Sequence, residues 1–577
     1  MVTPLLSIKN LSIQFSNDGT LSTAVSNNSF DVAAGELVAI VGESGSGKSV
    51  SALSILQLLP KQAVVNGEIL FGQEEAIDLL KLSHKNINNI RGNKIAMIFQ
   101  EPMTSLNPVF TCGYQVMEAI QLHQKVNKEI ARQKTIELFE KVQLPEPKNL
   151  ISRYPHELSG GQKQRVMIAM AMSCNPSILI ADEPTTALDV TVQKTILELI
   201  KSLQQPTGAG GQNNMGVIFI THDLGVVADI ADKILVMHKG EIVEQGSAKD
   251  ILHTPRHPYT KALLACRPAG QPKGKRLPVV SDFINQEAEL TEKMTAAEEP
   301  KTQDTRPENK NTVLEITNLS VHFPLKKNIF GKASTFFKAV DDVSFTVQQG
   351  DIVGLVGESG CGKTTLGRSI LQLIKPTAGK ILLNGKDLTQ TNSEVLRNMR
   401  KDLQIVFQDP YGSLNPRITV GDAILEPLKV HSVLSGNKQR KEKVMELLEK
   451  VSLDSSHFNR YPHQFSGGQR QRICIARALA LNPSFLIFDE SVSALDVSIQ
   501  AQVLNLLNDL KKEFGFTAIF ISHDLSVVHY ICNRILVMYK GKIVEAGTAD
   551  QVFYHPKNDY TQNLVNSIPG KNLYQSS

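Results

Sequence analysis

Two short stretches of the sequence combine glycines, a lysine and a hydroxyl side chain in the pattern G-x-x-x-x-G-K-[ST]. One reads GESGSGKS and the other GESGCGKT. Glycines allow a loop to wrap its backbone N–H groups around phosphate oxygens, and the helix that follows directs its positive end at them. The lysine would reach the terminal phosphates, and the hydroxyl would bind Mg²⁺. The pattern therefore predicts nucleotide binding at two places, through Gly42, Glu43, Ser44, Gly45, Ser46, Gly47, Lys48 and Ser49 in the first and Gly357, Glu358, Ser359, Gly360, Cys361, Gly362, Lys363 and Thr364 in the second.

Two apolar runs, SILIADE and SFLIFDE, each end in a pair of acids. Successive side chains of a strand point to opposite faces, so the two acids of a pair can do different work. We expect Asp182 and Asp489 to hold Mg²⁺, through water. Glu183 and Glu490 would then polarise the attacking water as general bases. Together with the phosphate loops, these acids predict hydrolysis of the bound nucleotide.

Glutamines and histidines after other strand-like runs complete the set. Gln100 and Gln408 would contact Mg²⁺ or the attacking water, and could report the state of the nucleotide to the segments that follow them. His222 and His523 follow VIFIT and AIFIS and would offer a neutral hydrogen-bond donor to the γ-phosphate. The predicted catalytic residues are thus Glu183, Glu490, His222, His523, Gln100 and Gln408, and the predicted Mg²⁺ ligands are Ser49, Thr364, Gln100, Gln408, Asp182 and Asp489.

The elements that must position these residues occur twice, in the same order. NKIAMIFQEPMTSLNP returns as KDLQIVFQDPYGSLNP, and VIFITHDLGVV returns as AIFISHDLSVV. ELVAIVG and DIVGLVG are short, continuously apolar runs, which are typical of strands buried on both faces of a parallel sheet. NKEIARQKTIELFEKVQL and NKQRKEKVMELLEKVSL predict a smaller helical subdomain in each half. We therefore expect an α/β fold with two P-loop domains, at residues 1–265 and 312–577, each with a parallel-sheet core and a helical subdomain.

Residues 266–311 separate the two repeats. They are rich in Lys, Glu, Pro and Thr and poor in aromatic residues, a composition that predicts a flexible tether. Within it, NQEAELTEKM at 285–294 could form a short helix.

The composition excludes several classes of protein. The net charge is only +4, and no block of basic residues is visible, so we expect no nucleic-acid partner. No window approaches 18 consecutive apolar residues and no secretory signal is visible, so contact with a membrane would come through another protein. The six cysteines are scattered and form no C-x-x-C pair, which argues against zinc and fits a reducing cytoplasm.

The segments LSGGQ and FSGGQ make a family resemblance specific. With the phosphate loops, the acid-ending strands, the ALD turns and the histidines, the chain resembles a tandem ATP-binding-cassette ATPase over both halves. Ser-Gly-Gly-Gln opens a helix and offers a hydroxyl and unhindered N–H groups to an anion. In this family two domains sandwich two ATP molecules head to tail, so the resemblance implies ATP and Mg²⁺ as ligands and two composite sites that both hydrolyse ATP.

Carried onto this sequence, the resemblance assigns residues of both halves to each site. The first site would combine Lys48, Ser49, Gln100, Asp182, Glu183 and His222 with the signature Ser466, Gly467, Gly468 and Gln469. The second would combine Lys363, Thr364, Gln408, Asp489, Glu490 and His523 with the signature Ser159, Gly160, Gly161 and Gln162. Asp189 and Asp496, in the ALD turns, would cross the interface. Phe15 and Phe323 match the place of the aromatic residue that stacks on adenine, although Tyr is more usual there and a plain core Phe is the alternative.

Two further segments resemble one transporter group. QEPMTSLNP and QDPYGSLNP resemble the segment that faces the permease in peptide importers. HTPRHPYTKALL, with the degraded form HPKNDYTQNLVNSIP in the second half, resembles the C-terminal extension of oligopeptide, dipeptide and nickel importer ATPases, and the fusion resembles glutathione-type and microcin-type importers. This implies import of di- or oligopeptides through two membrane permease subunits with an extracytoplasmic substrate-binding protein, at the cytoplasmic face of the bacterial inner membrane. LLACRPAG retains only Cys266 of a four-cysteine motif, so no iron–sulfur cluster is expected.

Alternatives stay open at this point. Nickel import is the alternative within the transporter group. Outside it, a soluble tandem ATPase that acts on ribosomes is disfavoured, because such proteins typically join their halves by a long, charged helical hairpin. Genome-maintenance ATPases need long coiled coils or zinc-binding cysteine pairs, and the sequence has neither.

Overall fold

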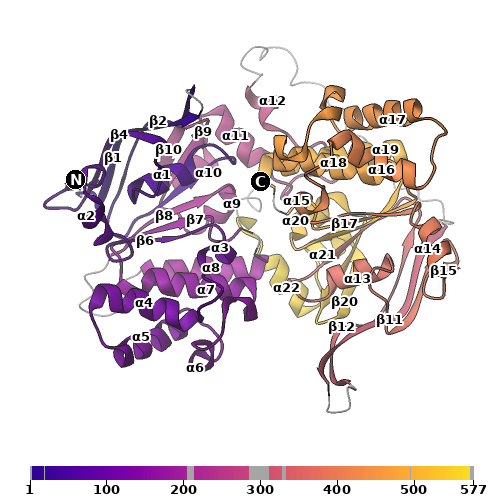
Figure 1. Cartoon of the computed structure of the whole chain (residues 1–577), viewed down its shortest axis with the longest axis horizontal. Coiled ribbons are helices and arrows are strands. Elements are labelled where there is room, and N and C mark those ends of the chain that lie inside the picture. Colours follow the sequence, from indigo (N-terminus) through magenta and orange to yellow (C-terminus); the bar gives the residue numbers. More distant parts are fainter. Residues whose placement is uncertain are drawn as a thin grey trace.

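Two similar assemblies of strands and helices lie side by side in the computed structural model, the first half of the chain on the left of Figure 1 and the second on the right. In the first half the helical part lies below the sheets, whereas in the second half it lies above them. The two halves therefore face each other in opposite orientations. The structure describes residues 3–17, 20–186, 188–204, 214–284, 311–327, 333–493 and 495–571.

The first half contains two sheets. A six-stranded sheet in the order β10-β9-β3-β8-β7-β6 is parallel except for its edge strand β10, and a four-stranded antiparallel sheet has the order β2-β1-β4-β5. The strands are β1 (Leu6–Asn17), β2 (Thr20–Val32), β3 (Leu37–Val41), β4 (Ala63–Phe71), β5 (Ile77–Asp78), β6 (Ile95–Ile98), β7 (Ile178–Asp182), β8 (Gly216–Thr221), β9 (Lys233–His238) and β10 (Glu241–Ser247).

The second half repeats this arrangement, with the orders β16-β17-β18-β13-β19-β20 and β12-β11-β14-β15. Its strands are β11 (Thr312–Lys327), β12 (Ala333–Gln348), β13 (Ile352–Val356), β14 (Ala378–Leu383), β15 (Lys386–Asp387), β16 (Leu403–Val406), β17 (Phe485–Asp489), β18 (Thr517–Ser522), β19 (Arg534–Tyr539) and β20 (Lys542–Thr548). Every residue of β3 and β13 is buried, as their continuously apolar sequences predict. The predicted α/β fold with a parallel core is confirmed.

The helices of the first half are α1 (Lys48–Ile55), α2 (His84–Asn88), α3 (Pro102–Ser105), α4 (Cys112–Gln124), α5 (Lys128–Lys141), α6 (Pro147–Leu150), α7 (Gly160–Ala171), α8 (Val190–Gln204), α9 (Leu224–Val227), α10 (Ala248–His253) and α11 (Pro258–Ala265), followed by α12 (Val280–Ile284). Those of the second half are α13 (Lys363–Ile370), α14 (Ser393–Met399), α15 (Pro410–Ser413), α16 (Val420–Val430), α17 (Asn437–Lys450), α18 (Gly467–Leu479), α19 (Val497–Phe514), α20 (Leu525–Ile531), α21 (Ala549–Tyr554) and α22 (Asp559–Asn566).

Both runs that predict a helical subdomain form helices, α5 and α17. The side chain of Asn127 caps α5 by accepting a hydrogen bond from the N–H of Ile130 at 2.9 Å. Ala131, Thr135 and Phe139 recur every four residues and are buried, so one face of α5 packs against its neighbours and the opposite face meets solvent.

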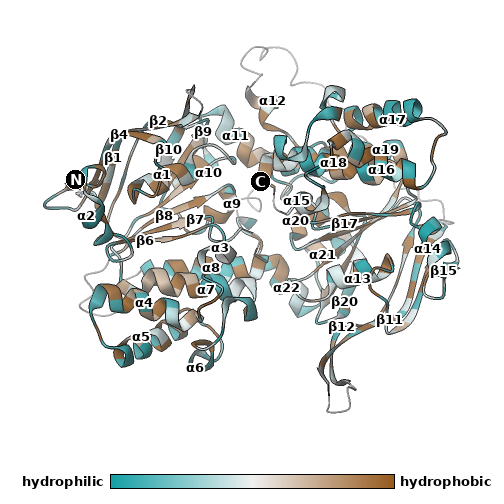
Figure 2. Cartoon of the chain, viewed as in Figure 1, coloured by the Kyte–Doolittle hydropathy of each residue, from teal (hydrophilic) through white to brown (hydrophobic). Residues whose placement is uncertain are grey.

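Apolar side chains concentrate on the central strands. In Figure 2 the strands β7, β8 and β17 are brown, whereas the outlying helix α14 is teal. One cluster of buried apolar side chains extends through both halves of the chain. None of the described helices is long and apolar enough to span a bilayer.

The segment at 266–284, where we expected the flexible tether to begin, is packed. Leu277 is fully buried, and its N–H donates to Oδ1 of Asn505 in α19 at 2.9 Å. The amide of Asn505 donates in return to the carbonyl oxygen of Leu277 at 2.8 Å. The expectation of flexibility is therefore wrong for this segment, because apolar residues within a polar stretch dock on the second half. The short helix expected at 285–294 lies outside the described residues.

Candidate active sites at the interface of the two halves

Each phosphate loop connects a buried strand to a helix, β3 to α1 and β13 to α13. At the start of these helices, Gly47 has φ 98° and Gly362 has φ 111°. A Cβ on Gly47 would lie 2.6 Å from the carbonyl oxygen of Ala24, and one on Gly362 would lie 2.1 Å from that of Ala339. Only glycine combines the left-handed backbone with this close approach. The glycine before the lysine is therefore required because a side chain there would collide with a neighbouring backbone carbonyl, in addition to its predicted role in phosphate binding.

The lysine of each loop is buried and folds back onto its own loop. Lys48 is only 4% exposed and donates to the carbonyl oxygens of Gly42 and Glu43, both at 2.8 Å. Lys363 makes the same two contacts in the second loop. Burial lowers the pKa of Lys48, although nearby carboxylates act in the opposite direction. An ammonium group that is short of water at this place is suited to bind a phosphate anion.

The hydroxyl that ends each loop is hydrogen-bonded to the first acid of the pair. Ser49 donates to Oδ1 of Asp182 at 2.9 Å, and Thr364 donates to Oδ1 of Asp489 at 3.0 Å. Burial raises the pKa of Asp182 to about 6 and also raises that of Asp489. Hydroxyl and carboxylate oxygens are the ligands that Mg²⁺ prefers, and a cation here would favour the ionised acid. Among the described residues no cluster of three or more His, Cys, Asp or Glu could hold a metal.

The second acid of each pair departs from the strand geometry. Glu183 has φ 46° and Glu490 has φ 47°, in the left-handed region that residues other than glycine seldom adopt. The amide of Gln100 donates to Oε2 of Glu183 at 3.0 Å, and Gln408 donates to Oε2 of Glu490 at 2.9 Å. The structure thus brings the predicted general base and the predicted glutamine together in both halves. The same unusual backbone in two separate segments points to a functional requirement.

The predicted histidines lie beside the same glutamates. Nδ1 of His222 is 3.5 Å from Oε2 of Glu183, and Nδ1 of His523 is 3.6 Å from Oε2 of Glu490. Burial lowers the pKa of His222, but the glutamate outweighs burial and the net direction is upward. Against the effect of burial, His222 lowers the pKa of Glu183 to about 2, and the second pair shifts in the same directions. The glutamates are therefore ionised, as a general base must be, and the same contacts raise the pKa of the histidines. The neutral histidine donor to the γ-phosphate stays a prediction.

Each phosphate loop is also hydrogen-bonded to the ALD turn of the other half. The backbone N–H of Ser44 donates to Oδ2 of Asp496 at 2.9 Å. The hydroxyl of Ser359 donates to Oδ1 of Asp189 at 2.8 Å. Both aspartates thus reach across the interface, at the positions where the family resemblance places them.

A second pair of contacts across the interface escaped the sequence reasoning. The hydroxyl of Ser498 donates to Oε1 of Glu43, and that of Thr191 donates to Oε1 of Glu358 at 2.7 Å. Both hydroxyls lie two residues after the aspartate of the ALD turn. The repetition of D-V-[ST] in the two halves was the signal that could have found them.

The signature serines are exposed and cap their own helices. Ser159 accepts a hydrogen bond from the N–H of Gln162 at 3.3 Å, and the side chain of Gln162 accepts one from the N–H of Ser159 at 3.1 Å. Ser466 and Gln469 form the same capping box at the start of α18. Contact between a signature and the phosphates bound by the opposite half, which the resemblance implies, therefore stays a prediction for the ATP-bound chain.

The two candidate adenine-stacking residues lie on the four-stranded sheets. Phe15 is half-buried in β1. Phe323 in β11 is 39% exposed and pairs in register with Phe337 of β12. Stacking of either ring on adenine stays a prediction.

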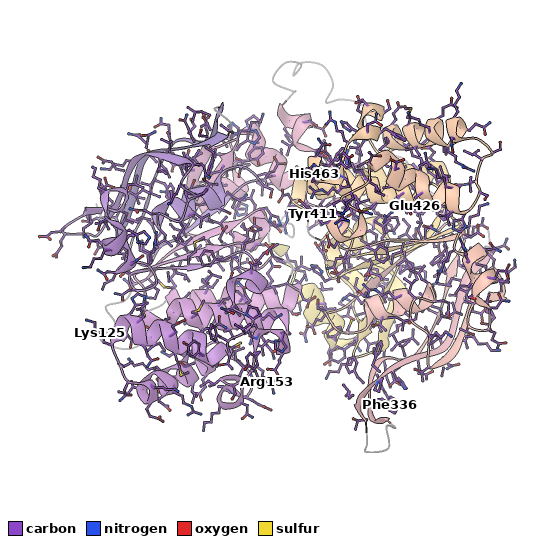
Figure 3. The ribbon with its side chains drawn as sticks, viewed as in Figure 1. Lys125, Arg153, Phe336, Tyr411, Glu426 and His463 are labelled. Carbon is purple, nitrogen blue, oxygen red and sulfur yellow. The ribbon has the colours of Figure 1, made fainter. Side chains whose placement is uncertain are left out.

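The segment that follows Gln408 is fixed to the signature helix of its own half. Tyr411 and His463 lie close together in Figure 3. The guanidinium of Arg470 lies 3.5 Å from the centre of the Tyr411 ring and donates to the carbonyl oxygen of His463 at 3.4 Å. Tyr411 is nevertheless 65% exposed, so this segment presents an aromatic ring to solvent.

Comparison with known protein families decides what these sites belong to. The family described as ABC transporter matches residues 25–186 and 340–493, which is more than half of the chain. The chain belongs to the ABC transporter family. A second family, described as the oligopeptide/dipeptide transporter C-terminal region, matches residues 243–292 and 544–573. The expected tandem arrangement of two ATP-hydrolysing cassettes, each with this C-terminal extension, is confirmed.

Relatives of this ABC transporter ATPase match it along nearly their whole length. The glutathione import ATP-binding protein GsiA of Pectobacterium atrosepticum is 47% identical over 571 residues, and that of Escherichia coli is 49% identical over 575 residues. Each alignment covers 98% of this chain and 89% of the relative. Among solved structures, the dimeric ATP-binding cassette MJ0796 in a post-hydrolysis state with ADP and Pi is 27% identical, covers 41% of this chain and 98% of its own, and has a TM-score of 0.37.

Proposed function

We propose that this ABC transporter ATPase drives the import of small peptides such as glutathione through separate permease subunits. The observation that carries this proposal is the match to glutathione import ATP-binding proteins over 98% of the chain. The extension typical of oligopeptide and dipeptide transporters, present in both halves, supports the same class of cargo. Nickel import is the alternative within the group.

For the reaction, we assign the water-activating role to Glu183 and Glu490. The low pKa of Glu183 keeps this side chain ionised at neutral pH, which is the form that can accept a proton from water. Gln100, hydrogen-bonded to this carboxylate, would keep it aimed at the water and pass changes at the base to the segment that follows. Mg²⁺, held with ATP by Ser49 and the Asp182 carboxylate, would neutralise charge on the phosphates.

We assign the two cassettes to residues 1–265 and 312–577, and each ATP site to both of them. The contacts of Asp496 and Asp189 with the opposite phosphate loops support this division of labour. The signature of the opposite half would close over the phosphates when ATP binds. Because both halves have a base, a glutamine and a histidine in the same arrangement, we propose that both sites hydrolyse ATP.

For the permease partners, we propose a contact surface just after the glutamine in each half. Exposed apolar residues support it, with Val109 70% and Phe110 45% exposed in the first half and Tyr411 65% exposed in the second. Two such surfaces would serve two permease subunits at the cytoplasmic face of the inner membrane, with a binding protein delivering cargo from the other side. We propose no iron–sulfur cluster, since the extension that matches at residues 243–292 contains Cys266 as its one cysteine.

A transport assay tests the proposed function. The chain is co-purified from membranes with its permease subunits, placed in proteoliposomes, and assayed for ATP-dependent uptake of labelled glutathione, dipeptides and Ni²⁺. We expect uptake of glutathione or dipeptides and none in the Glu183→Gln/Glu490→Gln chain. Uptake of Ni²⁺ alone would favour the nickel alternative, and recovery of the chain on ribosomes without any permease would overturn the proposal.

A further inference from the structure

Glu43, the second residue of the first phosphate loop, contacts three separate parts of the molecule. Its backbone N–H donates to the hydroxyl of Tyr259 in the C-terminal extension at 3.1 Å. Its carbonyl oxygen accepts a hydrogen bond from the ammonium of Lys48 at 2.8 Å. Its carboxylate accepts a hydrogen bond from Ser498 of the other half. One residue therefore joins the extension, the phosphate-binding lysine and the opposite cassette.

The second phosphate loop has the same three contacts. The N–H of Glu358 donates to the hydroxyl of Tyr560 at 2.9 Å, and its carbonyl oxygen accepts from Lys363 at 3.0 Å. Its carboxylate accepts from Thr191 of the first half at 2.7 Å. The two phosphate loops thus make the same three contacts, although the hydroxyl from the opposite half belongs to a serine in one case and to a threonine in the other.

The first tyrosine is held firmly in its place. Glu244 in β10, the edge strand of the six-stranded sheet, accepts hydrogen bonds from the N–H groups of Arg256 and His257, at 2.7 and 3.1 Å. Nδ1 of His257 then accepts from the N–H of Tyr259 at 3.2 Å, which caps α11. Tyr259 is fully buried, and its ring lies 4.1 Å from that of His238. The hydroxyl therefore meets the phosphate loop at a fixed position.

The degraded motif of the second half keeps this geometry. Glu545 accepts hydrogen bonds from the N–H groups of Lys557 and Asn558, at 2.8 and 3.1 Å. Asn558, in place of the histidine, caps α22 by accepting from the N–H of Tyr560 at 2.9 Å. The histidine of the first motif is thus replaced by another capping residue, while the tyrosine is the same in both.

We propose that Tyr259 and Tyr560 are positioning residues for ATP binding. Each fixes the backbone of the glutamate in its phosphate loop, so that the glutamate carbonyl aligns the lysine and the glutamate carboxylate meets the hydroxyl of the opposite half. The tyrosines act through the loop and do not themselves contact phosphate. The extension thereby links the assembly of the two halves to the shape of each phosphate loop. This inference rests on ATP hydrolysis by the chain and does not depend on the cargo.

Removal of one hydroxyl tests the positioning role. In Tyr259→Phe the ring still fills its site, but the N–H of Glu43 loses its acceptor, so the loop is less ordered before ATP binds. We expect the KM for ATP to rise about fivefold with kcat within about twofold of wild type. A merely structural role would lower the fraction of folded enzyme, which reduces kcat and leaves KM unchanged, and that result would overturn the proposal.

A double-mutant cycle tests whether the tyrosine acts through the glutamate. Tyr259→Phe and Ser498→Ala both affect Glu43, so we expect their combined effect on KM to be at least about threefold smaller than the product of the single effects. The matched control combines Tyr259→Phe with Thr191→Val. Thr191 contacts the second phosphate loop, so we expect the combined effect of this pair on KM to equal the product of the single effects. Equal behaviour of the two pairs would contradict the proposal. Melting temperatures are recorded for every variant, and if Tyr259→Phe does not fold, the cycle of Tyr560→Phe with Thr191→Val decides the question.

Discussion

The hydroxyl of Ser359, in the second phosphate loop, donates a hydrogen bond to Asp189 of the first half at 2.8 Å. In the other site the equivalent contact runs from the backbone N–H of Ser44 to Asp496. Replacement of the serine side chain removes the first contact but leaves the second in place. The two sites are therefore built alike, but we expect them to respond differently when this serine is replaced.

Ser359→Ala is expected to lower ATP hydrolysis about three- to tenfold, because a hydrogen bond to a carboxylate across the interface is lost. The matched control, Ser44→Ala, leaves the backbone contact to Asp496 in place and should lose less activity. Steady-state hydrolysis by the two purified variants measures the difference. A larger loss in Ser44→Ala would contradict the assigned contacts.

Glu183→Gln and Glu490→Gln test whether the two sites are equivalent. Each removes a proposed general base while keeping the shape of the side chain, so we expect turnover to fall about a hundredfold or more at the affected site. ATP should still bind, because Lys48 and Lys363 are untouched. Hydrolysis and equilibrium binding of a fluorescent ATP analogue measure the two effects separately. Near-wild-type turnover in either single variant would show that the altered site does not contribute equally to ATP hydrolysis.

The groups proposed to bind phosphate and metal could be predicted from the sequence because each depends on a short local pattern. Lys48 could be recognised because a strand, a glycine-rich loop and a lysine follow one another in the sequence. Asp182 and Glu183 could be recognised because they end an apolar strand. The repetition of every pattern also predicted the two-fold organisation. These are the parts of the site in which neighbours in the sequence are neighbours in space.

Contacts between distant segments could not be predicted in this way. The pairing of Ser498 with Glu43 depends on how two halves meet, and no local pattern encodes that arrangement. The docking of Leu277 was missed because the tether was judged by its average composition, while one buried leucine and one asparagine decide its position. The upward shift of the pKa of His222 could not be predicted either, because it depends on a glutamate contributed by a different strand.

Asn505→Ala is expected to release the start of the connector from α19. The variant loses both hydrogen bonds to the backbone of Leu277, which together contribute about 1–3 kcal/mol to docking. Trypsin cleavage after Lys275 or Arg276 requires this segment to detach locally, so we expect it to become about tenfold faster or more. Timed digestion followed by mass spectrometry measures the rate at these bonds.

The control for this experiment is Glu198→Ala, on the corresponding helix α8 of the first half. Glu198 lines an open groove with Lys194 and Asn566 and has no part in holding Leu277. The rate of trypsin cleavage after Lys275 in the Glu198→Ala variant should equal the rate in the wild type. Equal rates in Asn505→Ala and Glu198→Ala would show that the asparagine does not anchor the connector.

His529 makes the stability of the second half depend on pH. Burial lowers its pKa, and the hydrogen bond to Asp550 at 2.8 Å opposes burial without reversing its effect. The unfolded chain, with an ordinary histidine pKa of about 6.5, therefore takes up the proton at higher pH than the folded chain does. The stability that the neutral histidine provides is fully present above about pH 6.5 and is lost as the pH falls through that value towards the folded pKa.

Replacement of this histidine by a group that does not titrate tests the effect. His529→Gln keeps a donor for Asp550, and its melting temperature should fall less than that of the wild type between pH 7.5 and pH 5.5. Thermal unfolding of both proteins in the same buffers makes the comparison. An equal or larger fall in His529→Gln would rule out the histidine as the source of the dependence.

The most direct test of the composite sites is a cross-link that only one pairing of the halves permits. In a Glu183→Gln/Glu490→Gln chain whose six native cysteines are replaced, Ser44→Cys is combined either with Ser466→Cys of the opposite half or with Ser159→Cys of its own half. A short bifunctional thiol reagent is then added with and without ATP, and intramolecular cross-linking is read by gel mobility. We predict an ATP-dependent cross-link between positions 44 and 466 and none between 44 and 159. A cross-link between 44 and 159, or the absence of any between 44 and 466, would contradict the sharing of each ATP site by both halves.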